Sequence, residues 1–422
     1  MFLAFPRYCP RRPFPSPMAS YSLQPVETAA HRRAFLECPD QHYRGDPDAA
    51  RYYVRPNNQE IEAIFDPAKN KLFAAGGQAT RWLLLAADGQ AVGRIAAFVN
   101  PQIQATELVP VGGFGFFESP DDQGAANLLL DAARQWLESR GMQAMDGPVN
   151  FGDRDRFWGL HVDGFDRLPS YAMFYHRPYY QQLLETYGLQ LYFKQYSYWM
   201  SAFTPLAPRL HRLAATVAVK FPHLRYACAR PGQPERLARD LQRVYSLAWG
   251  RHAGVSEMSF DQARALVKKM KAVIDYHIIW FAYDGDDAVA MLVTLPGLNQ
   301  IFRRTGPNLN WLGKLRFVLE KHRWARRVDK LANAVLYGVV PEYQGTGVDA
   351  ALCVAAQPVF AGYGYCDGEL VWIGDFNPKM MAVCRTVGAH ICKTHHTYRQ
   401  YFDPAFPFER LPIIARDRKE TE

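Results

Sequence analysis

Several patterns that would assign a function class at once are missing from this sequence. No apolar run approaches the ~18–20 residues that a transmembrane helix needs, so we expect no membrane-spanning segment. The seven cysteines are scattered from Cys9 to Cys392 without a C-x-x-C pair, and no His/Cys spacing matches a zinc site. A disulfide framework and a metal site are therefore not expected, and a reducing, cytoplasmic location is favoured. Neither a P-loop nor a G-x-G-x-x-G motif occurs, which argues against those two nucleotide sites.

The composition is that of a globular protein with an excess of positive charge. At 422 residues, with 49% hydrophobic and 21% charged residues, the chain is long enough for two or three domains. The net charge of +8 fits an anionic partner such as coenzyme A, an acidic membrane surface or RNA. Residues 1–24 are rich in Pro and Arg and are expected to form a flexible N-terminal tail, and residues 406–422 are expected to be a C-terminal tail.

One α/β pattern runs along the chain twice. In the first copy, strands at 81–87 and 91–100 flank an Asp-Gly turn, and a helix at 123–140 precedes another strand at 144–150. The second copy repeats the order, which places two units at 25–204 and 205–405. The segment of the first copy that would match the loop described next, 118–122, carries three carboxylates, so we expect it to repel a phosphate.

That loop follows an apolar strand at 334–340 and contains Gln344-x-x-Gly347. A helix of small residues begins at about Gly347, so the free N–H groups of its first turn and its dipole would attract an anion. Glycines would let the backbone approach a phosphate closely. An ordinary strand-turn-helix without a bound anion would also be compatible with this sequence. A further strand at 369–374, a helix opened by Asn377-Pro378 and a strand at 389–402 extend the pattern.

Longer matches over roughly residues 26–403 resemble a tandem family of GCN5-related N-acetyltransferase (GNAT) folds from bacteria. The matching stretches are 92–97, 113–118, 147–150, 158–160, 163–165, 178–180 with Glu185, 295–296 with Asn299, 338–339, 341–343, and Glu369, Trp372 and Asn377. The pattern is similar to bacterial ceramide synthases and, less closely, to Fem-type aminoacyl-tRNA-dependent ligases. It departs from the usual GNAT loop at Asp349, where Gly or Ala is common.

The resemblance implies an α/β (α+β) fold of two tandem GNAT units, each a mixed, mostly antiparallel sheet flanked by helices. It implies an N-acyltransferase that moves an acyl group from acetyl-CoA or a long-chain acyl-CoA to an amine, possessing one donor site in the second copy and no metal. A long-chain base is the preferred acceptor. Transfer from aminoacyl-tRNA and a non-catalytic double-GNAT scaffold are the alternatives, and DNA is not an expected partner.

The same resemblance assigns roles to residues of the second copy. Donor binding would fall to Val339, Val340, Gln344, Gly345, Thr346, Gly347, Val348 and Asn377. Backbone N–H groups between Tyr337 and Val340 would face the acyl carbonyl. A plain helix N-cap explains Asn377 equally well.

Amine attack on a thioester also needs a base and an acid. Glu369 is the first candidate for the base and Asp375 the second, although Glu369 could equally be a surface charge at a strand end. Tyr337 and Tyr398 are unranked candidates for the acid. Acceptor binding is assigned to Trp249, His252, Glu257 and Asn299. A lone loop histidine such as His252 is commonly just exposed.

Residues 298–330 separate two strands and combine many Lys and Arg residues with Trp, Leu, Val and Phe. This composition is typical of an interfacial helix on an anionic membrane, at the inner face of the cytoplasmic membrane if the chain is peripheral. It would also suit tRNA, or a solvated helix packed on its own domain.

Overall fold

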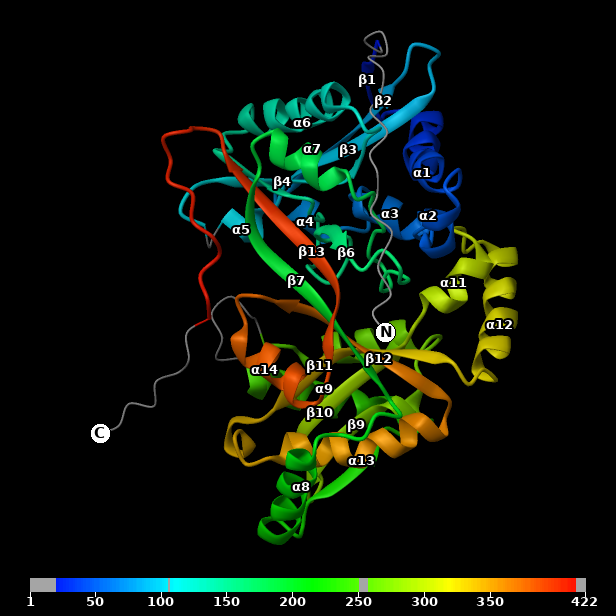
Figure 1. Cartoon of the computed structure of the whole chain (residues 1–422), viewed down its shortest axis with the longest axis vertical. Helices are drawn as coiled ribbons and strands as arrows, with labels where there is room; N and C mark the ends of the chain where they lie inside the picture. Colours follow the sequence, from blue (N-terminus) through cyan, green and yellow to red (C-terminus); the bar gives the residue numbers. More distant parts are fainter. Residues whose placement is uncertain (1–19, 105–106, 250–256, 415–422) are drawn as a thin grey trace, which may run out of the picture.

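The computed structural model describes residues 20–104, 107–249 and 257–414 (Figure 1). Within these ranges a 13-stranded sheet has the order β1-β2-β3-β4-β5-β13-β7-β12-β11-β10-β9-β8, with β6 beside β13. The strands of the first half are β1 Ser22–Pro25, β2 Gln78–Leu85, β3 Ala91–Val99, β4 Val111–Glu118, β5 Ala144–Gly147, β6 Leu160–Asp163 and β7 Gln190–Ser201. Those of the second are β8 Arg225–Cys228, β9 Ile279–Asp284, β10 Asp287–Pro296, β11 Lys330–Val339, β12 Tyr365–Gly374 and β13 His390–Tyr401.

Helices cover the sheet in both halves. The first half holds α1 Ala29–Tyr43, α2 Pro47–Tyr52, α3 Asn58–Ile64, α4 Lys71–Ala74, α5 Pro101–Gln104, α6 Gln123–Glu138 and α7 Tyr180–Thr186. The second half holds α8 Pro208–Lys220, α9 Pro234–Trp249, α10 Phe260–Met270, α11 Asn299–Thr305, α12 Trp311–Ala325, α13 Val348–Gly362 and α14 Pro378–Thr386, with 3-10 turns η1 Tyr276–Ile278 and η2 Pro341–Tyr343. None of the helices in the described ranges is long and apolar enough to cross a membrane.

The two halves repeat one topology. In each, two adjacent strands run parallel and are joined by a crossover helix: β4 and β5 through α6, and β11 and β12 through α13. The other neighbouring strands of the sheet are antiparallel. The predicted mixed, mostly antiparallel α/β fold with two repeats is therefore confirmed.

The halves exchange their last strands, which the sequence did not predict. Strand β7 pairs with β12 of the second half, whereas β13 pairs with β5 of the first, and β7 and β13 pair with each other. Figure 1 shows these two long strands crossing the centre of the molecule between the halves. Each half is thus completed by the other, and residues from both can reach one site.

Local sequence explains several of these elements. Asp122 is the N-cap of α6, where its side chain accepts the Ala125 N–H, and the buried face of the helix carries Leu129 and Leu137. The sequences of strands β9 and β10 are near-continuous apolar runs, which is why both strands can be almost wholly buried. The resulting core of the second half lies between α9, α10 and α13.

Candidate active site

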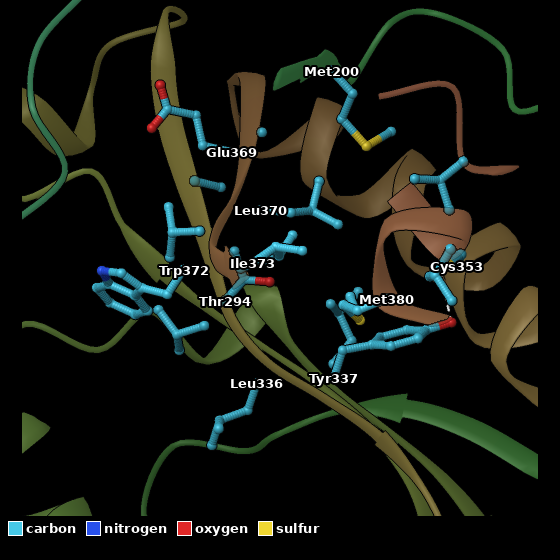
Figure 2. Close-up of a pocket in the computed structure, with 18 of the residues that line it drawn as sticks. Met200, Thr294, Leu336, Tyr337, Cys353, Glu369, Leu370, Trp372, Ile373 and Met380 are labelled. Atoms are coloured by element: carbon cyan, nitrogen blue, oxygen red, sulfur yellow. Dashed lines mark hydrogen bonds between the residues drawn. The ribbon is translucent and has the colours of Figure 1, made fainter. Parts of the chain in front are cut away.

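The site forms where two parallel strands separate. Strands β11 and β12 are paired only from Lys330 to Ala334 on one side and from Tyr365 to Leu370 on the other. Beyond these residues β11 stays with β10 and β12 stays with β7. The strands therefore diverge, and a cavity of about 620 Å³ occupies the opening (Figure 2).

Apolar side chains dominate this cavity. Those that line it include Leu336, Leu370, Ile373, Met380, Met200 and Phe360. Met200 lies at the end of β7, so the exchanged strand contributes part of the wall. A mostly apolar cavity of this size suits a hydrocarbon chain far better than an acetyl group alone.

Two irregularities shape the opening. A register shift in the pairing of β10 with β11 at Val293/Thr294 leaves Val335 as an extra residue. A second shift, between Leu370 and Ile373, bends β12, and Trp372 there has φ +61°. A non-glycine residue in the left-handed region is strained, and such strain concentrates at functional sites.

Backbone donors of β11 face the opening. The Val340 N–H bonds the Val289 carbonyl of β10 at 2.9 Å. Because N–H directions alternate along a strand, those of Tyr337 and Val339 point toward β12 instead. The expectation that Val340 itself donates to the ligand is therefore corrected, because its N–H belongs to the sheet.

The predicted phosphate loop joins η2 to α13. The Gln344 amide donates to the Val339 carbonyl at 3.0 Å, and the Thr346 hydroxyl donates to the Tyr343 carbonyl at 2.6 Å. These side chains shape the loop, so the anion contacts would come from the backbone. Gly345 (φ +74°) has open space where a Cβ would point.

Gly347 lies at the N-cap of α13 with φ +92°. A Cβ there would meet Val217 and Leu213 of α8 at 3.3 and 3.4 Å. The glycine is thus required by the left-handed conformation and by the approach of α8. Val348, next to it, is fully buried.

A buried ion pair stands at the cavity wall. Glu369 is 3% exposed, and its Oε2 accepts a hydrogen bond from Lys393 Nζ at 2.8 Å. Lys393, on β13, is fully buried and also donates to the Leu168 carbonyl at 2.8 Å and the Ser170 hydroxyl at 3.3 Å. The sequence analysis missed Lys393, because its partners come from β12 and from a loop of the first half.

Tyr337 and Cys353 lie on the other side of the opening from Glu369, as Figure 2 shows. The Tyr337 hydroxyl is 3.9 Å from Cys353 Sγ. Burial first, and then Cys353 and Asp349, raise the pKa of Tyr337 well above its usual range. Burial likewise raises the pKa of Cys353 to about 12. Both groups therefore remain protonated at neutral pH.

The remaining polar candidates have other partners. Asn377 lines the cavity and caps α14 by accepting the Met380 N–H at 3.1 Å. Asp375 instead accepts from the Lys194 N–H and pairs with Arg410, so it is not brought to the cavity. Tyr398 donates to Glu185 at 3.0 Å within the core of the first half. Of the two tyrosines, only Tyr337 is at the site.

Of the four predicted acceptor-binding residues, the structure describes the side chains of Asn299 and Glu257, and neither lines the cavity. The buried amide of Asn299 donates to the Pro169 carbonyl at 2.8 Å and ties α11 to the first half. Glu257 is exposed. Trp249 ends α9 with its side chain outside the described part of the chain, and His252 lies outside the described residues. No cluster of three or more potential metal ligands is found in the described ranges.

In the first half, the chain that follows β5 bonds β4 just beyond the residues through which β4 and β5 pair. The Val149 N–H bonds the Phe114 carbonyl of β4 at 2.7 Å. Glu118, at the end of β4, is buried and accepts from the hydroxyls of Tyr43 at 2.8 Å and Tyr180 at 2.7 Å. These contacts favour a donor site in the second half alone.

Comparisons with known proteins agree with this architecture. No family model matches the chain. It is 27% identical over 409 residues to the bacterial ceramide synthase of Caulobacter vibrioides, covering 92% of this chain and 99% of that protein. It is 24% identical over 379 residues to Protein YghO of Escherichia coli, covering 87% and 92%.

Among solved structures, a GCN5-related glucosamine N-acetyltransferase region of a fungal multi-domain enzyme superimposes with a TM-score of 0.51 at 13% identity. That match covers 92% of this chain and 38% of the longer fungal one. The predicted GNAT fold and the likeness to ceramide synthases are both confirmed. The chain is a tandem GNAT-fold protein that resembles a bacterial ceramide synthase along nearly its whole length.

Proposed function

We propose that the protein is an acyl-CoA-dependent N-acyltransferase whose acceptor is a long-chain base. The GNAT fold and the ceramide synthase relative support the coarser assignment, an acyltransferase. The observation that carries the finer one is the apolar cavity of about 620 Å³ between β11 and β12, with the carboxyl of Glu369 at its wall. Such a cavity has room for a long acyl chain or for the tail of a lipid amine.

The donor would bind along β11 and the N-terminus of α13. The open loop at Gly345 and the first-turn N–H groups of α13 suit a pyrophosphate. The N–H groups of Tyr337 and Val339, which face the opening, suit the amides of the pantetheine arm and the thioester carbonyl. Asn377 caps α14 and lines the same space.

In the proposed reaction the neutral amine attacks the thioester carbon, so a C–N bond forms and the C–S bond breaks. Glu369 accepts a proton from the amine, and the hydroxyl of Tyr337 supplies one to the departing thiolate. Glu369 is preferred to Asp375 because only Glu369 lines the cavity. Lys393 acts as a positioning residue that balances the charge of the buried carboxylate.

The test is an acyl-transfer assay on the purified full-length chain that follows the release of free CoA thiol. Donors would be acetyl-CoA and palmitoyl-CoA, and acceptors a long-chain base and a short alkyl amine. We expect turnover with palmitoyl-CoA and the long-chain base, and a large loss of kcat in Glu369→Gln with binding of CoA retained. Turnover only with short amines would refute the lipid acceptor. An unchanged kcat in Glu369→Gln would refute the assigned base.

A Fem-type ligase and a scaffold predict other results. The first would bind charged tRNA and no CoA thioester. A non-catalytic scaffold would transfer no acyl group from either a CoA thioester or charged tRNA, so the native chain and Glu369→Gln would both show no turnover.

A further inference from the structure

Helix α12 has two apolar faces, one of which points to solvent. Its inner face packs through Trp324, which is 5% exposed, and through Phe317, whose ring centroid is 5.1 Å from that of Phe302. Its outer face exposes large apolar side chains: Trp311 by 72%, Leu312 by 44%, Leu315 by 52%, Val318 by 49% and Leu319 by 52%. Five such residues on one short helix are far more than the scattered exposed apolar residues of an ordinary surface.

These five residues form one continuous stripe. Leu315 and Val318 follow Trp311 at spacings of four and seven, and Leu319 follows Leu312 at a spacing of seven. At about 100° per residue, these spacings place all five within roughly a third of the helix circumference. The stripe cannot be a face that packs on its own domain, because Phe317 and Trp324 already occupy the packed side.

Basic side chains border the stripe. Lys314 lies on one flank, Arg316 and Arg323 lie on the other, and Arg326 follows at the C-terminal end. Arg323 pairs with Glu320 at 2.5 Å. Within the described residues, no acidic side chain pairs with Lys314, Arg316 or Arg326, although each is exposed. An apolar strip between positive flanks matches an anionic lipid surface in both polarity and charge.

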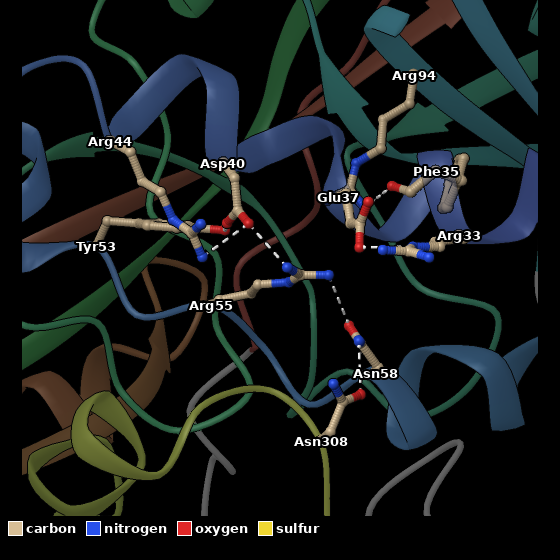
Figure 3. A network of polar contacts seen from close by, with 10 residues as sticks. All are labelled: Arg33, Phe35, Glu37, Asp40, Arg44, Tyr53, Arg55, Asn58, Arg94 and Asn308. Carbon is tan, nitrogen blue, oxygen red and sulfur yellow. Dashed lines mark hydrogen bonds and ion pairs between the residues drawn. The ribbon is translucent and has the colours of Figure 1, made fainter.

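The helix is held firmly in this orientation. The Trp324 indole donates to Gln300 Oε1 of α11 at 2.9 Å. At the other end, Asn58 of the first half donates to Asn308 at 2.9 Å, and Asn58 in turn accepts from Arg55 at 3.3 Å (Figure 3). Arg55 is anchored by Asp40 at 2.8 Å. Both halves thus brace α12, so its outer face is a preformed surface.

We propose that the outer face of α12 docks the protein on an anionic phospholipid bilayer, with the stripe entering the interface and Lys314, Arg316 and Arg326 contacting headgroups. The docking goes beyond the acyltransferase activity and can be measured without turnover. A failure of either proposal is therefore distinguishable from a failure of the other.

The test is vesicle flotation of the full-length chain, with phosphatidylcholine alone and with phosphatidylcholine mixed with phosphatidylglycerol. One variant combines Lys314→Glu, Arg316→Glu and Arg326→Glu; another combines Leu315→Ser and Leu319→Ser. The matched control, with the same change in charge on α10 and its C-cap, is Lys268→Glu, Lys269→Glu and Lys271→Glu. All of these side chains are exposed, so folding should be preserved.

We expect binding to the anionic vesicles that weakens with added salt. Loss of three basic contacts should reduce partitioning on the order of a hundredfold. The serine variant should also lose binding, whereas the control should bind like the native chain. A blue shift of tryptophan emission on binding should disappear in Trp311→Phe.

The proposal is overturned if the native chain stays unbound, or if either α12 variant binds as the native chain does. It is equally overturned if the native chain does not bind vesicles but self-associates in light scattering, and the α12 variants abolish that self-association. The same holds if the native chain retains tRNA in a gel shift and the α12 variants do not. The face would then belong to a second copy or to RNA.

Discussion

Replacement of Gly345 by aspartate should weaken CoA binding through charge alone. Gly345 has φ +74° and open space where its side chain would project, so a side chain fits without collision. Asn and Asp tolerate this left-handed conformation better than other residues, and their strain, about 1 kcal/mol, is nearly the same. Gly345→Asn is therefore a control of equal shape without charge. Gly347 is a poorer position, because a side chain there would meet Val217 and Leu213.

The size of the effect follows from Coulomb's law. A carboxylate ~6 Å from a phosphate charge, at an effective dielectric constant between ~20 and ~80, costs about 0.7 to 3 kcal/mol. One such charge pair alone weakens binding by a factor between about three and about a hundred. Isothermal titration with CoA should thus give a Kd at least several-fold higher for Gly345→Asp than for Gly345→Asn, with the gap narrowing in high salt. Equal Kd values for the two variants would refute a pyrophosphate site at this loop.

Three further predictions concern the buried ion pair, a buried histidine of β6 and the cavity. Lys393→Met leaves the carboxylate of Glu369 buried without a counter-charge, so the free energy of unfolding measured in urea should decrease by about 3 to 5 kcal/mol. Adding Glu369→Gln to this variant should restore most of the lost stability, and a double variant as unstable as Lys393→Met would contradict a charge effect. Burial lowers the pKa of His161 in the folded protein from 6.5 to about 3, so between these pH values the unfolded chain binds a proton that the folded protein does not. The free energy of unfolding should therefore decrease by about 1.4 kcal/mol for each unit by which the pH is lowered through this range. His161→Phe should make the acid profile less steep by about this amount, while buried His176 and His395, whose pKa values are also lowered, keep their share of the slope; an unchanged slope would contradict the assignment. Ala334→Phe fills the cavity and should shift the preference toward shorter acyl-CoA donors in competition assays; an unchanged preference would place the acyl chain elsewhere.

The elements around the loop were predictable because their signals are local. The apolar run before Pro341, the glycines after it, and Asn377-Pro378 each determine the conformation of a few neighbouring residues. Glu369 stays a candidate for the base; it pairs with Asn333 of β11 close to the point where β11 and β12 separate. The sequence also indicated correctly that the segment after β10 forms helices rich in basic and apolar residues.

The missed features depend on contacts between distant residues. Lys393 meets Glu369, Ser170 and Leu168 only because β13 passes between the halves, and no spacing along the chain reports that exchange. Asp375 has the sequence position of a site carboxylate, yet it pairs with Arg410, 35 residues away, and does not line the cavity. Asn299 was likewise predicted to bind the acyl acceptor, whereas in the structure its amide donates a hydrogen bond to the Pro169 carbonyl and so links the two halves.

The most direct test of the central claim is the mass of the product. Purified protein would be incubated with isotopically labelled palmitoyl-CoA and an unlabelled long-chain base, and the lipid fraction analysed by mass spectrometry. The account predicts the labelled N-acyl amide, formed in equal amount to free CoA and absent with Glu369→Gln. Release of CoA without any amide, or no consumption of the thioester while the protein binds it, would contradict the account.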